Sequence, residues 1–292
     1  MIKKLKKLLT NPLSVIGIAI ILFYVGVAVA APWIAPPQRR DPYQIPREGW
    51  SSTPRPPGEA GLFGTTEGQY DIFYGVVWGT RTAFRVSLMV VGFASLIGIF
   101  IGTLAAFYGG AIDSILMRIV DVFYSIPYLV AAMVLTTILG RSLDNALIAL
   151  IVFGWMGYAR LIRGNILSVK EEEYVSAANA VGASDYRVVF RHIIPNSIFP
   201  VLVQASMNMG SVVITAATLS FLGVGAPEGY ADWGQLISFA RNWILGTQGN
   251  TFQFWHTVVI PGAAITFFCL SWNLIGDAFR DIMDPKLQGG GV

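Results

Sequence analysis

Charged side chains are scarce in this sequence. Of its 292 residues, 20 are Lys or Arg and 17 are Asp or Glu, together 13%, about half of what a soluble domain carries. Apolar residues make up 54%, more than a soluble domain of this size covers with polar surface. This composition excludes a disordered or collagen-like chain, argues against a cytosolic enzyme and indicates a membrane protein. The formal net charge of +3 is too small for a nucleic-acid-binding protein.

The sequence also lacks the residues of common catalytic and metal sites. Its one cysteine, Cys269, excludes an intrachain disulfide and a cysteine metal cluster, and its apolar surroundings predict a buried side chain rather than a reactive thiol. No P-loop, hydrolase or zinc-protease motif is present. Asp113 and Asp121 are better explained as solvated helix ends than as a catalytic pair. We therefore expect no catalytic residue, metal site or cofactor in this chain.

Long stretches without any charged residue are the strongest positive signal. Six of them lie at residues 8–38, 86–112, 122–140, 145–159, 192–227 and 242–276. A helix needs roughly 20 residues to cross about 30 Å of hydrocarbon, and five runs reach or nearly reach that length. The fourth run has 15 residues and becomes long enough if Arg160 and Arg163 extend toward the interface. We predict an all-α membrane protein with six transmembrane helices.

Basic residues predict the orientation of these helices. The lysines at positions 3, 4, 6 and 7 should stay in the cytoplasm, and six crossings return the C-terminus to that side. The cytoplasmic segments would be the N-terminus, 113–121, 160–191 and 277 onward. The lysines, followed by an apolar stretch with small residues at 28–31, also resemble a cleavable secretory signal. The apolar core at 13–31 is longer than such a signal usually has, which favours an uncleaved first span.

The long outer connection after the first span is rich in proline, with seven between residues 36 and 57. Proline at this density excludes a regular helix and favours extended structure or turns. Residues 71–85 mix apolar with polar side chains, which predicts a short helix on the outer interface before the second span. An ordinary loop is the alternative.

Small residues recur every four positions in the second predicted span, at Ala94, Gly98, Gly102 and Ala106. Such a ladder lets a neighbouring helix approach closely, so we expect helix packing there. A similar but weaker pair, Ser206 and Gly210, lies in the fifth run.

Titratable groups are nearly absent from the predicted spans. Proton-driven transporters usually hold carboxylates or histidines at membrane depth. Here every Asp and Glu lies outside the six runs, and His192 and His256 are expected to be interfacial or structural. A solute moved by this chain would therefore draw its energy from elsewhere.

The segment between the fourth and fifth spans is the most informative connection. Residues 174–182 predict a short helix with small residues on its surface, ended by Gly182. A second helical piece at 185–192 would be capped by Ser184 and ended by Pro195. A shallow, mildly apolar surface of this kind suits insertion into a partner's groove. A plain amphipathic connector is the alternative.

These residues resemble a known signature. Ala177-Ala178-x-x-x-Gly182, followed after nine residues by His192-x-Ile194-Pro195, resembles the EAA motif of ABC-importer permeases. The chain departs from that motif where Ser176 replaces Glu, His192 replaces Ile and Ile194 replaces Leu. Residues 191–196, Arg-His-Ile-Ile-Pro-Asn, are similar to the dipeptide and oligopeptide branch of the family. Residues 220–225 and 232–234 resemble the outer loop before the last span in that branch.

The resemblance implies a C-type permease with a MetI-like transmembrane domain in a prokaryotic plasma membrane, with both termini cytoplasmic. Residues 1–35 would hold the tail and first span, 36–83 the outer loop, 84–285 the permease core and 286–292 the C-terminal tail. The chain would form half of a heterodimeric pore with a B-type permease. Two ABC ATPase subunits would bind ATP and Mg, and an extracytoplasmic substrate-binding protein would deliver di- or oligopeptides.

By the same resemblance, the ATPase-coupling residues would be Tyr174, Val175, Ser176, Ala177, Ala178, Asn179, Ala180, Val181, Gly182 and Pro195. The sequence assigns no substrate-binding residue. Nickel chelates or oligosaccharides are alternative cargoes for a related importer. A stand-alone secondary transporter is disfavoured by the missing intramembrane carboxylates, and a membrane enzyme by the missing catalytic motif.

Overall fold

The computed structural model describes residues 11–244 and 252–283, and their regular structure is helical apart from three isolated β-bridges. Five helices are long and apolar enough to cross a membrane, and a bent pair of shorter helices is a sixth candidate. The prediction of an all-α membrane protein is confirmed. Five of the predicted spans correspond to these candidates, and the third corresponds to the bent pair.

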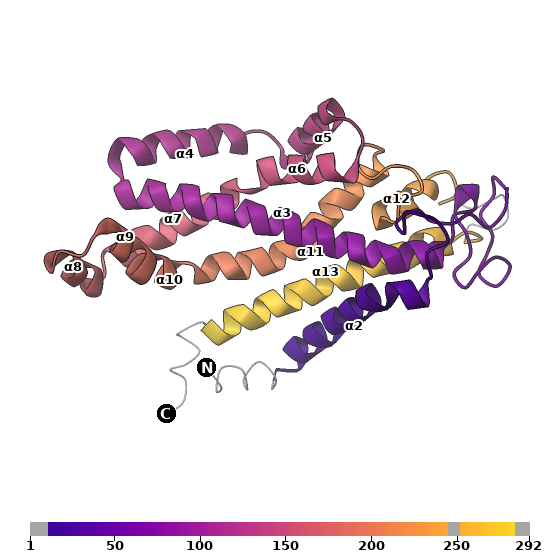
Figure 1. The fold of residues 1–292 in the computed structure, drawn as a ribbon, viewed down its shortest axis with the longest axis horizontal. Coiled ribbons are helices and arrows are strands. Elements are labelled where there is room, and N and C mark those ends of the chain that lie inside the picture. The colour runs from indigo at the N-terminus through magenta and orange to yellow at the C-terminus, as the bar shows by residue number, and fades with distance from the viewer. Residues whose placement is uncertain (1–10, 245–251, 284–292) are drawn as a thin grey trace.

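The bundle consists of eight longer helices within the described residues (Figure 1). They are α2 (Pro12–Ile34), α3 (Ile72–Tyr108), α4 (Gly110–Tyr124), α5 (Tyr128–Leu139), α6 (Leu143–Gly154), α7 (Met156–Lys170), α11 (Phe199–Phe221) and α13 (His256–Met283). Shorter elements are η1 (Glu67–Gln69), α8 (Glu173–Ala180), α9 (Asp185–Val188), η2 (Val189–Ile193), α10 (Ile194–Ser197) and α12 (Trp233–Phe239). Helices α8–α10 lie at one end of the bundle, and α12 with the proline-rich connection lies at the other.

Helix α2 matches the first predicted span. The Asn11 side chain caps its start by accepting a hydrogen bond of 3.0 Å from the Leu13 amide. The helix packs on α13, where the Tyr24 hydroxyl donates to the Ala264 carbonyl at 2.8 Å. A Cβ added at Gly17 would lie 2.7 Å from Leu274 Cβ, so the two backbones approach closely. The first and last spans are therefore neighbours.

Helix α3 corrects the prediction of a separate interfacial helix at 71–85. Those residues are the first turns of one 37-residue helix, about 55 Å long at 1.5 Å per residue. Asp71 caps it by accepting from the Phe73 amide at 2.8 Å. Arg81 and Arg85 lie before the charge-free run, but the Arg81 guanidinium donates to the Ala28 carbonyl at 2.6 Å and lies over the Trp78 ring. This charge is satisfied inside the fold and does not interrupt the helix.

The third and fourth spans also differ from the charge-free runs. Helices α4 and α5 meet at a bend of 81°, so residues 113–121, predicted as a connection, are helical. Pro127, which has no amide hydrogen to donate, precedes α5 at this bend. Residues Leu143–Lys170 form one 28-residue candidate span from α6 and α7, in place of the predicted 15-residue run.

Helix α13 begins at His256, well after the start of the sixth charge-free run; residues 245–251 of that run lie outside the described residues. Cys269 is buried, as predicted, and faces α11, where its Sγ lies 3.2 Å from the Gly210 carbonyl oxygen. His256 is fully buried at the first turn of α13. The predicted lysine cluster and the tail at 286–292 also lie outside the described residues.

The ladder of small residues on α3 faces α7. A Cβ added at Gly98 would lie 2.5 Å from Tyr158 Cβ, and one added at Gly102 would lie 2.3 Å from the Ala159 carbonyl oxygen. Ala94 and Ala106 are also buried. The two helices can approach this closely only because these positions carry so little side chain.

The proline-rich connection forms a cap at the end of the bundle where α3 begins and α12 lies. Ile45 is fully buried in it, and the Trp78 indole donates to the Ala35 carbonyl at 2.9 Å. The Tyr43 and Tyr230 rings stack with centroids 5.3 Å apart. On the side of α3 that faces α12, a Cβ added at Gly79 would lie 2.6 Å from the Trp233 ring, so α12 packs directly on the α3 backbone.

Candidate functional site

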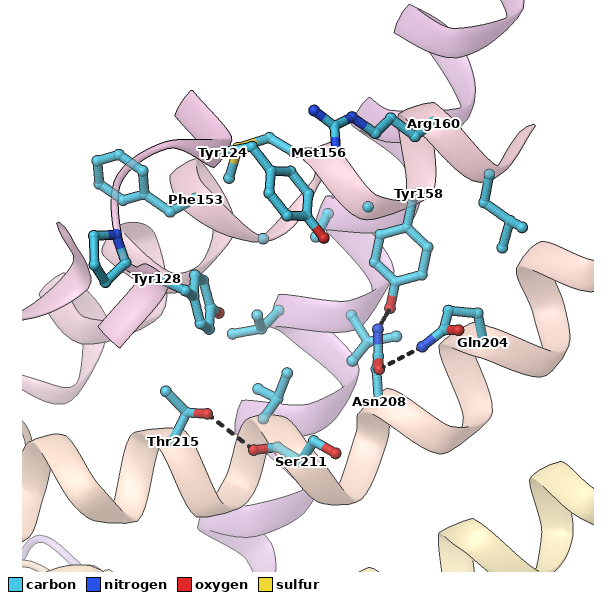
Figure 2. Close-up of a pocket in the computed structure, with 18 of the residues that line it drawn as sticks. Tyr124, Tyr128, Phe153, Met156, Tyr158, Arg160, Gln204, Asn208, Ser211 and Thr215 are labelled. Carbon is cyan, nitrogen blue, oxygen red and sulfur yellow. Dashed lines mark hydrogen bonds between the residues drawn. The ribbon is translucent and has the colours of Figure 1, made fainter. Parts of the chain in front are cut away.

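A cavity of about 910 Å³ opens between α3, the α4–α5 bend, the α6–α7 junction and α11 (Figure 2). This volume is within the range of pockets that hold small organic ligands. The chain therefore presents a large hollow at the level of its spanning helices, although the sequence analysis assigned no residue to such a site.

Four neutral polar residues line the α11 side of the cavity. They are Gln204, Asn208, Ser211 and Thr215, at a spacing of four, three and four residues. That spacing places them on one face of a helix, and we call this face the polar stripe. The periodicity was present in the sequence, but the search for charged groups in the spans did not detect it.

The polar stripe is hydrogen-bonded to the opposite wall (Figure 2). Asn208 Nδ2 donates to the Tyr158 hydroxyl on α7 at 2.8 Å, and Asn208 Oδ1 accepts from Gln204 Nε2 at 2.9 Å. The Thr215 hydroxyl instead donates to the Ser211 carbonyl at 3.0 Å. Asn208 thus connects α11 with α7 across the cavity.

Aromatic side chains form much of the remaining wall. Tyr124, Tyr128 and Phe153 come from the α4–α5 bend and from α6, and the Tyr128 hydroxyl donates to the Leu150 carbonyl at 3.2 Å. Arg160 is the one charged residue among those lining the cavity, and its guanidinium lies 4.3 Å from the centre of the Tyr124 ring. Neutral donors and acceptors can hydrogen-bond the amide groups of a ligand, and aromatic rings can pack against its apolar groups. Such a lining is less suited to a metal ion or a phosphate.

Helix α7 joins the cavity to the predicted coupling segment. It lines the cavity through Tyr158 and ends at Lys170, two residues before the cap of α8. The Lys170 ammonium donates to the Ala106 and Phe107 carbonyls at 3.0 and 2.8 Å. A cation at the C-terminal end of a helix satisfies orphan carbonyls and complements the helix dipole. Lys170 therefore fixes the start of the predicted coupling segment to the end of α3.

Two ion pairs join α7 to α4. Arg163 binds Asp113 through Nε and Nη2, both at 2.6 Å, and Arg160 binds Asp121. The prediction of solvated helix ends holds for Asp121, whose side chain is 62% exposed, but not for Asp113, whose side chain is only 18% exposed and is held by Arg163. Residues 113–121 were predicted as a connection because they carry charges. In the fold, the two aspartates of this stretch are paired with arginines on α7, so α4 remains helical.

The structure places the predicted coupling residues on α8 and the turn after it, apart from Pro195, which lies in α10. Most of them are exposed: Tyr174, Ser176, Ala177, Asn179, Ala180, Val181, Gly182 and Pro195. Val175 instead points into the bundle, where it is buried with Ile166, Val188 and Ile193, and Ala178 is half-buried. Gly182 has a φ of +77°, a left-handed conformation that glycine adopts without strain. Val175 thus anchors the segment while its neighbours stay accessible.

Pro195 does not end the second helical piece, contrary to the prediction. Helix α9 passes through the π-helical turn η2 into α10, and Pro195 lies exposed in the first turn of α10. Proline is compatible with a first helical turn because the amide it lacks would have no partner there. The wider π-helical turn before it accommodates the missing hydrogen bond.

Two family models match the sequence. One, described as a binding-protein-dependent transport system inner membrane component, matches residues 96–289. The other, the N-terminal TM domain of oligopeptide transport permease C, matches residues 4–49. The two matches together cover the first span and most of the remaining bundle.

Curated relatives align along nearly the whole chain. One from Escherichia coli K12, named "Probable D,D-dipeptide transport system permease protein", is 39% identical over 96% of this chain and 89% of its own length. The dipeptide transport system permease protein of Alkalihalophilus pseudofirmus is 35% identical over 98% of this chain and 89% of its own. The oligopeptide transport system permease protein of Bacillus subtilis is 31% identical over 96% and 87%.

Solved structures share the fold at lower identity. A chain of the inward-facing MetNI methionine ABC transporter matches with a TM-score of 0.54 and 20% identity, over 71% of this chain and 97% of its own. A chain of an amino acid ABC transporter with histidines matches with a TM-score of 0.53 and 18% identity, over 70% and 92%. These matches support the arrangement of the helices.

Proposed function

Because the chain belongs to the family of binding-protein-dependent transport system inner membrane components, we propose that it forms half of a pore that imports di- and oligopeptides. The other half would be a B-type permease, so that the cavity beside α11 faces a similar surface across the pore. The polar stripe carries this proposal, because neutral amide and hydroxyl groups can exchange hydrogen bonds with a peptide backbone of any sequence.

The energy for import enters through partner subunits. Two ABC ATPases would bind ATP and Mg and contact α8, whose exposed small residues can enter a shallow cleft. An extracytoplasmic binding protein would deliver the peptide at the end formed by α12 and the proline-rich cap. This orientation places α8 and both chain termini in the cytoplasm and the chain in a prokaryotic plasma membrane.

Movement of α8 would reach the cavity through α7. Lys170 at the end of α7 and Val175 in the first turn of α8 fasten the segment to the bundle, and Tyr158 on α7 bonds to the polar stripe. Arg160 and Arg163 make α4 move with α7. Closure of the ATPases would thus shift several cavity walls together, as alternating access requires.

Transport by the reconstituted complex tests this proposal. The assay measures ATP-dependent uptake of a labelled dipeptide by proteoliposomes that contain both permeases and the ATPases, with the binding protein added. Gly182→Val should abolish uptake, because a β-branched residue at φ +77° distorts the turn after α8. Gly164→Ala, at an α7 position with open space around it, is the matched control and should leave uptake unchanged.

Two results would contradict the proposal. Normal uptake and normal ATPase co-purification by Gly182→Val would remove α8 as the coupling segment. Uptake of nickel chelates or oligosaccharides, with no uptake of peptides, would assign the pore to the alternative cargoes.

A further inference from the structure

A second pocket, of about 610 Å³, lies in the outer cap, at the opposite end of the bundle from α8. Its walls come from the proline-rich connection, which supplies Arg39, Arg47 and Trp50, and from the loop after α11, which supplies Glu228. Tyr70, which is buried, forms part of its wall. Segments far apart in the sequence therefore build this pocket together.

The walls of this outer pocket are held in place by backbone contacts. The Ile45 amide donates to the Gly229 carbonyl at 2.8 Å, next to an antiparallel bridge between Gln44 and Tyr230. A Cβ added at Gly229 would lie 2.8 Å from the Tyr70 ring, so this loop is seated directly on the tyrosine. A pocket with fixed walls loses little conformational entropy when a ligand binds.

Charges of opposite sign line the pocket. Glu228 has a side chain that is 61% exposed and accepts a hydrogen bond from Tyr70 at 3.2 Å through one oxygen, with Arg47 3.6 Å away. Arg39 is exposed and has no hydrogen-bond or ion-pair partner within residues 11–244 and 252–283. The pocket thus offers the second oxygen of the Glu228 carboxylate, and the Arg39 guanidinium, which has no partner among the described residues.

An aromatic side chain completes the pocket. Trp50 is 89% exposed, and the Arg47 guanidinium lies 5.7 Å from the centre of its ring. Tryptophan is costly to leave in water and is enriched where a ligand or partner covers it.

We propose that this outer pocket binds a short peptide by its two termini, with Arg39 on the C-terminal carboxylate and Glu228 on the N-terminal ammonium. Trp50 would cover a side chain. The proposal rests on the peptide cargo proposed above and adds a first binding site outside the main cavity. A zwitterion matches the paired charges, and guanidinium binds carboxylate in a bidentate geometry. Glu228 lies on the loop after α11, the helix whose polar stripe lines the main cavity.

Binding of modified dipeptides to the intact complex tests this assignment. The complex of both permeases with the ATPases is placed in nanodiscs without the binding protein. Affinities for alanyl-phenylalanine, its N-acetyl form and its C-terminal amide are then measured by titration calorimetry. Each modification should weaken binding to the wild type about tenfold, the effect of losing one hydrogen-bonded charge.

The variants turn this into a pair of thermodynamic cycles. Arg39→Gln should bind the free dipeptide about tenfold more weakly and should no longer distinguish the amide from the free acid. Glu228→Gln should lose discrimination against the N-acetyl form in the same way. Arg40→Gln, a neighbouring arginine that does not line the pocket, is the control and should behave as wild type.

Three outcomes would overturn the assignment. The first is that Arg39→Gln binds the free dipeptide with the same affinity as the wild type. The second is equal binding of all three ligands by the wild type. The third is weakened docking of the binding protein to Arg39→Gln with peptide binding unchanged, which would make the pocket a contact for an acidic side chain of that protein. Failure of the cargo proposal would be seen separately, as absent dipeptide uptake by the wild-type complex in proteoliposomes.

Discussion

Arg163 binds both carboxylate oxygens of Asp113, with each nitrogen-to-oxygen distance 2.6 Å. The pair joins α7, which leads into α8, to α4, which borders the cavity through the bend after it. The Asp113 side chain is only 18% exposed, against 66% for Asp144 in its pair with Arg85. The pair of Arg163 with Asp113 is therefore less screened by solvent, so removing Arg163 should cost more than removing Arg85.

Replacing Arg163 should destabilise the protein more than replacing Arg85. Arg163→Gln leaves a half-buried carboxylate without its partner, and we expect a loss of about 1–2 kcal/mol. Arg85→Gln removes a solvent-exposed pair and should cost below about 1 kcal/mol. Thermal unfolding of the two purified variants, followed by size-exclusion chromatography after heating, gives the comparison. Equal midpoints for Arg163→Gln and Arg85→Gln would show that the pair of Arg163 with Asp113 adds no special stability.

Replacing Lys170 should reduce coupling between ATP hydrolysis and uptake. Lys170→Met keeps the aliphatic stem but removes the ammonium that caps the Ala106 and Phe107 carbonyls. The lost interaction is worth roughly 0.3–1 kcal/mol, so the amount of peptide transported per ATP should fall by about twofold to fivefold. Lys170→Arg retains the charge and should lie between Lys170→Met and wild type. An unchanged transport-to-hydrolysis ratio in Lys170→Met would separate this lysine from coupling.

Replacing Asn208 should impair transport without removing the protein from the membrane. Asn208→Leu is close in size but breaks the bonds to Tyr158 and Gln204 and leaves polar groups unpaired. We expect uptake to fall about tenfold, equivalent to one lost hydrogen bond to a buried partner. Thr218→Val on the same helix, outside the cavity lining, should stay within about twofold of wild type. Comparable uptake by both variants would remove the polar stripe from the transport path.

Adding one methyl group to α3 should have opposite consequences at two glycines. At Gly102 the new Cβ would meet the Ala159 carbonyl oxygen at 2.3 Å, whereas at Gly92 nothing lies within 4 Å. Gly102→Ala should therefore cost about 1–3 kcal/mol through overpacking, and Gly92→Ala should be neutral or slightly stabilising. Unfolding midpoints of the two variants test this contrast, and a neutral Gly102→Ala would mean that α7 can move away from α3 freely.

Asp232 gives a stability effect that depends on pH. Burial raises the pKa of its carboxyl above the ordinary value, so the folded protein holds this proton more tightly than the unfolded chain. Its contribution favours folding at acid pH and is lost as pH rises from about 4 through the raised folded pKa. Asp232→Asn keeps an acceptor for the Gln235 amide at the start of α12 and should raise the unfolding midpoint at neutral pH. Its advantage over wild type should shrink as pH falls.

Asp232→Ala is the matched control for that experiment. It removes the carboxylate together with the helix cap, which costs about 1 kcal/mol, so its midpoint should lie below that of Asp232→Asn at every pH. A wild type that gains stability relative to Asp232→Asn on raising the pH would reverse the assigned direction of the pKa.

Charge-free runs in the sequence located most of the spanning segments but misjudged their ends. Arg85 and Asp113 bound the second run, although both are satisfied by partners from other helices. Such partners are invisible to a search for local patterns, because they are distant in sequence. The bend at Pro127 could not be predicted either, because the sequence shows the proline but not the 81° angle between α4 and α5.

The candidate site was only partly predictable. The short helix at α8 and the turn at Gly182 could be predicted from the sequence, but the inward orientation of Val175 follows from packing against Ile166 and Val188. The polar stripe could have been found by testing neutral polar residues for helical periodicity. The outer pocket could not, because Arg39 and Glu228 come together only through the folded cap.

The contact between α2 and α13 has a consequence for biogenesis. Tyr24 and Gly17 meet residues near position 270, so α2 leaves the ribosome well before this neighbour, which follows Tyr24 by 240 residues. At about 5–20 residues per second, α2 waits in the lipid for more than ten seconds with that face uncovered. A nascent chain that stops before α13 therefore carries an unpaired helix surface, which membrane proteases could use to recognise an unfinished protein.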